Sequence, residues 1–494
     1  MSSMNEKNKK FYLTTAIPYV NAKPHIGHAL EFVQADVIAR VHRLRGEEVC
    51  LLSGGDENAL KNVQAAEQEG APVQEFIDRN AESFAELARQ LDVQFDVFQK
   101  GSDRTHHFPS SQELWRRCAA AGDIYKKSYE GLYCVGCETF YAVDELNGSG
   151  ECFEHPGKKL ELVAEENYFF RLSRYQNELI KLIETDALAI MPRHRKNEVT
   201  SFLKQPLQDI SISRTNARAK NWGVPVPGDD TQRIYVWFDA LNIYQSGVGF
   251  GWDEERYQKW WPADAHLIGK GILRFHAVYW PAFLLSAQLP VPKALYVHGY
   301  ITIDGQKMSK TLGNGIDPFG LIEKYGADPV RYYLLREIPS GEDGDFSIKK
   351  FEERYNGDLA NGLGNLVARV ATLGEKISPI SLNDVYPKEQ PRTKVIDEAY
   401  EKRVAEFRLN EALELIWGLI SLGDKNINDG KPWAVSDEAE LRRIIGDACH
   451  LISTVSRLVA PFIPETARKI NEQISVGEME IIIKRGANIF PRLR

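Results

Sequence analysis

The sequence predicts an α/β fold built on a parallel sheet, with a cysteine-rich insertion and an all-helical C-terminal region. Residues 11–20 and 48–57 are apolar, β-branched runs of strand length, and the segment between them repeats apolar residues at helical spacing. A strand, a helix and a strand in about 45 residues form a βαβ unit, whose strands lie parallel. After about residue 346 the pattern is helical throughout.

The predicted helix of the βαβ unit begins after Pro24 and ends at Gly46. Its apolar residues recur at helical spacing: Ile26, Leu30, Val33, Val37, Val41 and Leu44. Ligands of parallel sheets bind beyond the carboxyl ends of the strands. We therefore expect residues 24–28 (Pro-His-Ile-Gly-His) and 54–57 (Gly-Gly-Asp-Glu) to border a ligand site.

A turn-rich, cysteine-rich segment follows from about residue 120. Four possible metal ligands lie in two pairs fourteen residues apart, Cys134-x2-Cys137 and Cys152-x2-His155. Two such turns can close a tetrahedron of three thiolates and one imidazole, which leaves no open position on a zinc ion. We predict one structural Zn²⁺ per chain in this insertion. Incidental cysteines beside a solvated histidine are the alternative.

The α/β pattern resumes at residues 233–247 and continues as a strand and a helix over 264–288. Residues 293–318 indicate a strand, a hairpin and a polar loop, and amphipathic segments at 409–429 and 442–470 are typical of bundle helices. The predicted bounds are 1–119 and 232–292 for the two halves of the α/β domain, 120–231 for the insertion, 293–350 for the loop region and 351–494 for the helical domain.

Composition limits the class of protein. The net charge of −8 argues against a general nucleic-acid coat protein, although it allows a local basic surface that binds one RNA. No run of about 18 apolar residues predicts a membrane span. The N-terminal residues contain no apolar secretory core, so we expect a cytoplasmic protein.

Two polar motifs could hold an anion. His25 and His28 lie i, i+3 on the first turn of the predicted helix, so both project from one face. A zinc pair would need a third ligand, and an isolated pair is more often buried in a core. However, a helix start offers unpaired N–H groups, and Gly27 leaves room for a flat ring. The loop at 307–311 (Lys-Met-Ser-Lys-Thr) could clamp a polyphosphate, although a solvated basic turn is commoner for such a motif alone.

In this order on one α/β chain, residues 25–28 (HIGH) and 307–311 (KMSKT) resemble the two signatures of the class I aminoacyl-tRNA synthetases. Thr311 replaces a usual serine and keeps the hydroxyl. Over nearly the whole chain the sequence is further similar to the methionyl-tRNA synthetase family, in stretches such as AIPYVNAKPHIGHALEFVQADVIAR, YCVGCETFY, VWFDALNIY, RFHAVYWPAFL and VHGYITIDGQKMSK. The resemblance implies a Rossmann-type catalytic domain, a zinc-knuckle insertion and a C-terminal helical domain that binds the anticodon.

The resemblance also implies a methionine–tRNA ligase. Such an enzyme activates methionine with ATP to methionyl-adenylate, releases pyrophosphate, and transfers the methionyl group to the 3'-terminal adenosine of tRNA(Met). The attacking carboxylate is already ionised, so the reaction needs positioning and neutralised phosphate charge rather than a general base. Histidines at a helix start, two loop lysines and Mg²⁺ bound with ATP would supply this.

The resemblance also assigns roles to the residues of this chain that match the family's motifs. The resemblance implies that the catalytic groups at the phosphates are His25, His28, Lys307 and Lys310, and that the other ATP contacts are Gly27, Glu31 and Gly269. Asp56 would bind the ammonium of methionine, and the side-chain pocket would consist of Ile17, Tyr19, Trp237, Ala240, Leu241, Tyr244 and His298. Aromatic rings suit a thioether. Taken singly, each aromatic could equally be a plain core residue.

The helical domain would read the anticodon through Asn365 and Arg369, four residues apart on one helix face, and through Trp433. Stacking on an aromatic ring and hydrogen bonds to base edges are how proteins read single-stranded bases. Two positions depart from the family pattern. Gly271 stands where members commonly carry an aspartate near the ribose, and Asn58 stands where many carry a histidine, a change expected to alter only local hydrogen bonding.

Two rival hypotheses remain. A synthetase for leucine, isoleucine or valine would carry a larger editing insertion than residues 120–231, and a cysteine enzyme would keep thiolates on the catalytic sheet. A tRNA-binding paralogue without catalysis is supported only by Gly271. The chain ends about where the family's core ends, so we expect a monomer whose partners are ATP, methionine and tRNA(Met), and no membrane.

Overall fold

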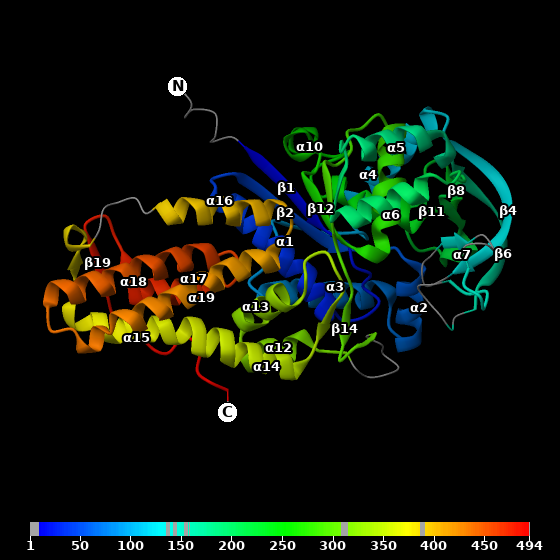
Figure 1. The fold of residues 1–494 in the computed structure, drawn as a ribbon. Helices are drawn as coiled ribbons and strands as arrows, with labels where there is room; N and C mark the ends of the chain where they lie inside the picture. Colours follow the sequence, from blue (N-terminus) through cyan, green and yellow to red (C-terminus); the bar gives the residue numbers. More distant parts are fainter. Residues whose placement is uncertain are drawn as a thin grey trace, which may run out of the picture. The chain divides into compact units, whose positions relative to one another are not determined.

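The computed structural model describes residues 9–134, 139–141, 146–152, 157, 159–307, 315–385 and 391–493 (Figure 1). Contacts divide the chain into two compact units. The first consists of residues 1–24, 42–89 and 93–298, and the second of residues 25–41, 90–92 and 299–494. Each unit is thus assembled from segments that lie far apart in the sequence.

A six-stranded sheet, in the order β3-β2-β1-β12-β13-β7, is the centre of the first unit. Its strands are β1 Lys10–Thr15, β2 Glu48–Gly55, β3 Val97–Lys100, β7 Ala189–Met191, β12 Ala265–Gly269 and β13 Ala294–His298. All neighbouring strands are parallel, which confirms the α/β fold class. The first strand ends at Thr15 rather than at residue 20, and beyond it only Tyr19 pairs again, with Asp56.

The helices of the first unit bury a core that is rich in aromatic side chains. They are α2 Leu60–Glu69, α3 Val73–Gln90, α4 His107–Ala120, α5 Gln176–Glu184, α6 Arg193–Leu203, α7 Asn216–Ala219, α8 Val236–Leu241, α9 Ile243–Ser246, α10 Glu254–Trp260 and α11 Trp280–Ser286. In this core Phe238 lies between Trp115 and Phe283, with ring centroids 5.6 and 4.6 Å away. The packing fixes α8, which carries several predicted pocket residues, against α4 and α11.

Residues 120–231 contribute strands both to antiparallel sheets and to the parallel six-stranded sheet. Their strands are β4 Ile124–Cys134, β5 Thr139–Tyr141, β6 Glu161–Phe170, β8 Ile210–Ser211, β9 Ser213–Thr215, β10 Pro225–Val226 and β11 Asp229–Ile234, the last of which ends beyond the segment. The long β4–β6 ribbon belongs to an antiparallel sheet, β5-β4-β6-β8. However, β7 pairs with β13, and Phe170 packs in the main core. Part of the predicted insertion therefore belongs to the main sheet and its core.

The second unit is mainly helical. Its helices are α1 Ile26–Leu44, α12 Pro318–Tyr325, α13 Ala327–Glu337, α14 Ile348–Arg354, α15 Asn365–Gly374, α16 Pro391–Ala405, α17 Leu409–Gly430, α18 Glu438–Val459 and α19 Pro464–Gln473. The α1 helix has the extent predicted from apolar spacing, and Gly46 follows it with φ of 80°. Within the described part of the chain, none of the helices combines the length and the apolar character that crossing a bilayer requires.

Two features of the second unit differ from the sequence-based expectation. The segment 442–470 is two helices, because α18 ends at Val459 and α19 starts at Pro464, a residue suited to a first helical turn. The region after 346 also contains strands, because β17 Ile380–Ser381, β18 Ile474–Val476 and β19 Glu480–Ile483 form a three-stranded sheet. Another three-stranded sheet precedes that region and consists of β14 Ile301–Ile303, β15 Gln306–Lys307 and β16 Gly344–Phe346, in which β14 and β15 are antiparallel neighbours within the predicted hairpin segment.

A buried arginine joins three parts of the second unit. The Arg331 guanidinium on α13 donates to the Asp36 carboxylate of α1 at 2.7 Å, and both side chains are fully buried. It also donates to the backbone oxygens of Leu91, Pro461 and Phe462 at 2.7–2.9 Å. All five guanidinium donors point in a fixed fork, so this one side chain fixes α1, α13 and the α18–α19 turn together. We call these residues the Arg331 cluster.

Candidate active site

The sheet of the first unit has one switch point, between β1 and β12. From β1 the chain proceeds outward through β2 to β3 on one side, and later from β12 to β13 on the other. In open α/β sheets the crevice beyond the carboxyl ends of two such strands is the usual ligand site. Ile17 and Tyr19 follow the end of β1, and Gly269 is the last residue of β12.

Asp56 is held at this edge by its main chain. Its backbone N–H donates to the Pro18 backbone oxygen at 2.9 Å, and its backbone oxygen accepts a hydrogen bond from Asn62 Nδ2 at 2.8 Å. The side chain is only 2% exposed. Because the backbone is anchored on both sides, residue 56 has a defined position directly after β2.

Aromatic rings from three segments meet beside Tyr19. The Trp237 ring of α8 lies edge-on to Tyr19 with centroids 6.2 Å apart, and it stacks on Phe275 at 3.8 Å and 5°. Sequence reasoning did not single out Phe275. It opens a π-helical turn, Phe275–Tyr279, within the RFHAVYW stretch, and such turns are frequent at functional sites. The structure therefore brings Tyr19, Asp56 and Trp237 together and adds Phe275.

A chain of hydrogen bonds supports the pocket residue Tyr244. Its hydroxyl lies 2.7 Å from His276 Nε2, while His276 Nδ1 donates to the Ile272 oxygen at 2.9 Å. Nε2 is consequently the acceptor of the tyrosine proton. Burial lowers the pKa of His276 to about 4, so the ring is neutral at pH 7. A neutral wall suits an uncharged side chain.

The other predicted pocket residues are mostly buried. Ala240 and Leu241 are 4% and 1% exposed, and Leu241 belongs to the main hydrophobic core, as does Tyr244. Ile17 packs partly buried against the same core. His298 pairs with Gly269 across β12 and β13, and a methyl group added at Gly269 would lie 3.4 Å from its ring. Gly269 and the buried His298 ring are therefore close neighbours at the ends of these two strands.

The histidine pair lies on the second unit, at the start of α1. Their ring centroids are 3.8 Å apart. His25 Nδ1 accepts the Gly27 N–H and His28 Nδ1 accepts the His25 N–H, both at 3.1 Å. The rings thus cap N–H groups that the sequence had suggested were unpaired, and the Nε2 atoms carry the protons. Although His25 reaches solvent, surrounding protein desolvates its ring and lowers its pKa to about 4.

Gly27 has a steric role beneath His25. A side-chain carbon at this position would lie 3.0 Å from His25 Cε1, which is tighter than most such contacts, so the ring would have to shift. Glycine therefore lets the ring fold onto the helix start. Glu31 is almost buried one turn later, at 8% exposure. Lys307 ends the hairpin strand β15, and Lys310 and the side chain of Lys307 lie outside the described residues.

Two of the four predicted zinc ligands can be described. Cys134 ends β4 and Cys152 lies in the following loop region, both almost fully buried, with their Sγ atoms 3.3 Å apart. In a tetrahedral zinc site two thiolates lie about 3.8 Å apart. The two sulfur atoms are closer than this separation and within hydrogen-bond distance of each other, and no group of three possible metal ligands occurs among the residues that the structure describes. Cys137 and His155 lie outside the described residues.

The predicted anticodon residues lie together on the second unit. The Arg369 guanidinium is 5.8 Å from the centre of the Trp433 ring, and it donates to Asn428 at 2.8 Å and to Asp424 at 3.3 Å. Trp433 is 57% exposed, and Asn365 is also exposed one turn before Arg369. A large exposed ring beside a guanidinium is suited to stacking with a base.

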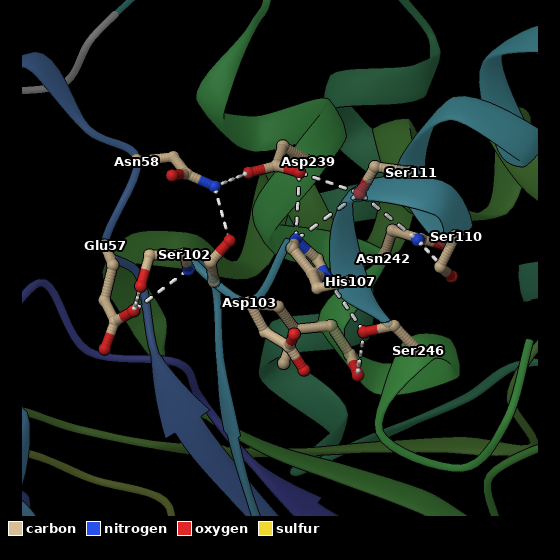
Figure 2. Close-up of polar contacts among 12 residues, drawn as sticks. Glu57, Asn58, Ser102, Asp103, His107, Ser110, Ser111, Asp239, Asn242 and Ser246 are labelled. Carbon is tan, nitrogen blue, oxygen red and sulfur yellow. Dashed lines mark hydrogen bonds and ion pairs between the residues drawn. The ribbon is translucent and has the colours of Figure 1, made fainter. Parts of the chain in front are cut away.

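A buried polar network lies behind the pocket and includes no predicted residue. Figure 2 shows Asp239 of α8 between His107, Ser111 and Asn58. His107 also contacts Ser246 Oγ at 2.7 Å, which gives a serine–histidine–aspartate array. However, Ser246 and His107 are completely buried. No substrate could reach this serine, so the array is not a nucleophilic site.

The comparisons with known proteins agree in one family. The family model of class I tRNA synthetases (M) matches residues 11–371. A methionine–tRNA ligase of Thermotoga maritima is 42% identical over 95% of this chain and 76% of its own length, and one of Brucella suis is 41% identical over 95% and 92%. The Mycobacterium tuberculosis methionyl-tRNA synthetase in complex with methionyl-adenylate is 37% identical, with a TM-score of 0.91 over 98% of this chain and all of that one. The chain belongs to the class I methionyl-tRNA synthetase family.

Proposed function

We propose that the chain is a methionine–tRNA ligase, which forms methionyl-adenylate from methionine and ATP and transfers the methionyl group to tRNA(Met). The observation that carries this proposal is the buried Asp56 carboxylate beside the aromatic wall of Tyr19, Trp237 and Phe275. A carboxylate pairs with an ammonium, and aromatic rings attract a thioether sulfur. Methionine combines the two groups.

On the nucleotide side we assign the Nε2–H groups of His25 and His28 to the phosphates of ATP. Their Nδ1 atoms are occupied by backbone N–H groups, so each ring presents a donor whatever its charge. Glu31 and Gly269 are assigned to the adenosine, with Gly27 beneath the His25 ring. Lys307 and Lys310 would neutralise phosphate charge together with Mg²⁺ bound to ATP.

The direct test is ATP–pyrophosphate exchange with each amino acid in turn. Exchange that depends on methionine alone is the expected result. Exchange with another amino acid would identify a different class I synthetase, and none with any amino acid would favour a tRNA-binding paralogue. Gly271 offers no carboxylate to the proposed ribose site, where family members commonly carry an aspartate. The KM for ATP in the same assay measures how far this difference weakens ATP binding.

We also propose a structural zinc held by Cys134, Cys137, Cys152 and His155, in a connective insertion over residues 120–231. The buried thiol pair supports it. Metal analysis should find about one zinc per chain. Removal by a chelator should make the β4–β6 ribbon sensitive to limited proteolysis, because four ligands hold its tip.

The control for the zinc prediction is another buried cysteine. Cys134→Ala should abolish zinc retention, whereas Cys449→Ala, on α18, should leave the zinc content unchanged. An unchanged proteolysis pattern after verified metal loss would refute the structural role.

For tRNA we assign residues 351–494 to anticodon binding, with Trp433 as a stacking platform and Asn365 and Arg369 at base edges. Trp433→Ala should lower kcat/KM for tRNA charging by about tenfold or more, because a stacked base contributes about 1–3 kcal/mol. Exchange should be unaffected. Met479→Ala, another exposed apolar residue of the second unit, is the control and should alter neither assay. Equal loss in both assays for Trp433→Ala would contradict the assignment.

A further inference from the structure

Asn58 connects two segments of the first unit through a single amide group. Its Nδ2 donates to Asp239 Oδ2 at 2.6 Å and to the Gly101 oxygen at 2.7 Å, as Figure 2 shows for the aspartate. Both partners can only accept, so they fix which end of the amide faces them. A residue without two N–H donors at this position cannot make the same bridge.

Asp239 is itself held rigidly. Its carboxylate is 2% exposed, and Oδ1 accepts hydrogen bonds from His107 Nε2 at 2.9 Å and from Ser111 Oγ at 2.7 Å. Both donors belong to α4. Asn58 supplies the third donor, from the loop after β2. Three donors compensate the buried charge, so the carboxylate is a fixed reference point between α4 and α8.

The two ends of this bridge lie next to the two halves of the proposed methionine site. Asn58 comes two residues after Asp56, and the intervening Glu57 is anchored by Ser102, whose N–H and hydroxyl both donate to its carboxylate. Asp239 comes two residues after Trp237, within the short helix α8. The Asn58–Asp239 bond, between residues 181 positions apart in the chain, therefore ties the Asp56 loop to the aromatic pocket.

We infer that Asn58 and Asp239 are positioning residues that set the distance between the ammonium-binding carboxylate and the side-chain pocket. This inference rests on the proposed methionine ligase function. Neither residue need touch substrate. Their bond holds the two recognition elements at one separation, and an amino acid of the wrong length cannot satisfy both at once. The network thus acts on methionine binding and not on ATP.

Two variants of Asn58 test this on the full-length protein by ATP–pyrophosphate exchange. Asn58→Ala removes the bridge and leaves Asp239 two donors, so the fold is retained. We expect the KM for methionine to rise about tenfold with the KM for ATP unchanged. Asn58→Asp keeps the shape but turns both donors into acceptors facing a carboxylate and a carbonyl, so its effect should be larger in the same direction.

A glutamine in the same unit provides a matched control. The Gln176 amide donates to two acceptors in the same way, the backbone oxygens of Leu203 and Gln205 at 2.9 and 3.1 Å, but it borders no proposed substrate contact. Gln176→Ala should leave both KM values unchanged. A merely structural role of Asn58 would lower the active fraction, and so kcat, without changing the KM for methionine relative to that for ATP.

The outcomes separate the inference from the function on which it rests. If the unaltered protein shows no methionine-dependent exchange, the proposed function and the inference both fail. If it exchanges normally but Asn58→Ala keeps the same KM for methionine, or loses kcat alone, the inference fails and the function stands. Should Asn58→Asp not fold, as judged by circular dichroism, the result for Asn58→Ala decides.

Discussion

Replacing Asp56 by asparagine should lower kcat/KM for methionine in the exchange assay by about 10²–10³-fold. Asparagine has the same shape, but it offers no charge to the ammonium group, and losing one partner of a buried charge pair costs about 3–4 kcal/mol. The fold should persist, because the position of residue 56 depends on its main chain and on Asn62. Steady-state exchange with methionine and ATP varied separately measures the effect.

The neighbouring carboxylate is the control for this prediction. Burial raises the pKa of Glu57, and its Oε2 accepts from Ser102. Glu57→Gln can keep these hydrogen bonds through its amide oxygen, so it should change the KM for methionine much less. An unchanged KM for methionine in Asp56→Asn, or an equal effect of both variants, would contradict the ammonium role.

Replacing Arg331 by methionine should lower the free energy of unfolding of the second unit by about 3–5 kcal/mol. The substitution removes Arg331 from the buried Asp36 carboxylate, which keeps its ion pair with Arg40 at 2.6 Å, and it takes donors from three backbone oxygens. Thermal or urea unfolding followed by circular dichroism would detect the shift. An unchanged midpoint would show that the Arg331 cluster contributes nothing to stability.

Two further variants separate charge from packing in the Arg331 cluster. Adding Asp36→Asn to Arg331→Met should recover part of the loss, since the interior then holds no carboxylate that has lost its Arg331 partner. Arg468→Ala on α19 removes an exposed ion pair with Glu465 and should shift the unfolding midpoint little, because such pairs are screened by solvent.

The sequence predicted best those helices and strands whose extent is set by the local spacing of apolar residues. Apolar spacing and Gly46 define α1 without any tertiary information, and the βαβ unit implies the parallel sheet. β7 could not be predicted in the same way. It has only three residues, Ala189–Met191, too few for a periodic signal, and its strand character comes from pairing with β13. The strand β19 does alternate exposed and buried residues, but it has only four residues, so the alternation is too short to be recognised between the longer helical patterns.

Candidate site residues that lie within a sequence motif could be predicted. Contacts that form only when distant segments fold together could not. His25, Asp56 and Trp237 lie within recognisable stretches. Phe275 lies in one too, but its stacking on Trp237 depends on the π-helical turn. The network around Asp239 draws its members from positions 58, 107, 111 and 239, and no single stretch of sequence contains more than two of them.

The Arg331 cluster also has a consequence for how the nascent chain matures on the ribosome. Asp36 leaves the exit tunnel early, but its partner Arg331 follows 295 residues later, and the Phe462 carbonyl 131 residues after that. At translation speeds of about 5–20 residues per second this interval is roughly 20–90 s. Throughout it, the Asp36 carboxylate can pair with Arg40 of the same helix but not with Arg331. The Arg331 cluster can therefore be completed only when the chain is nearly finished, so the three parts of the second unit that it joins are fixed together late in synthesis.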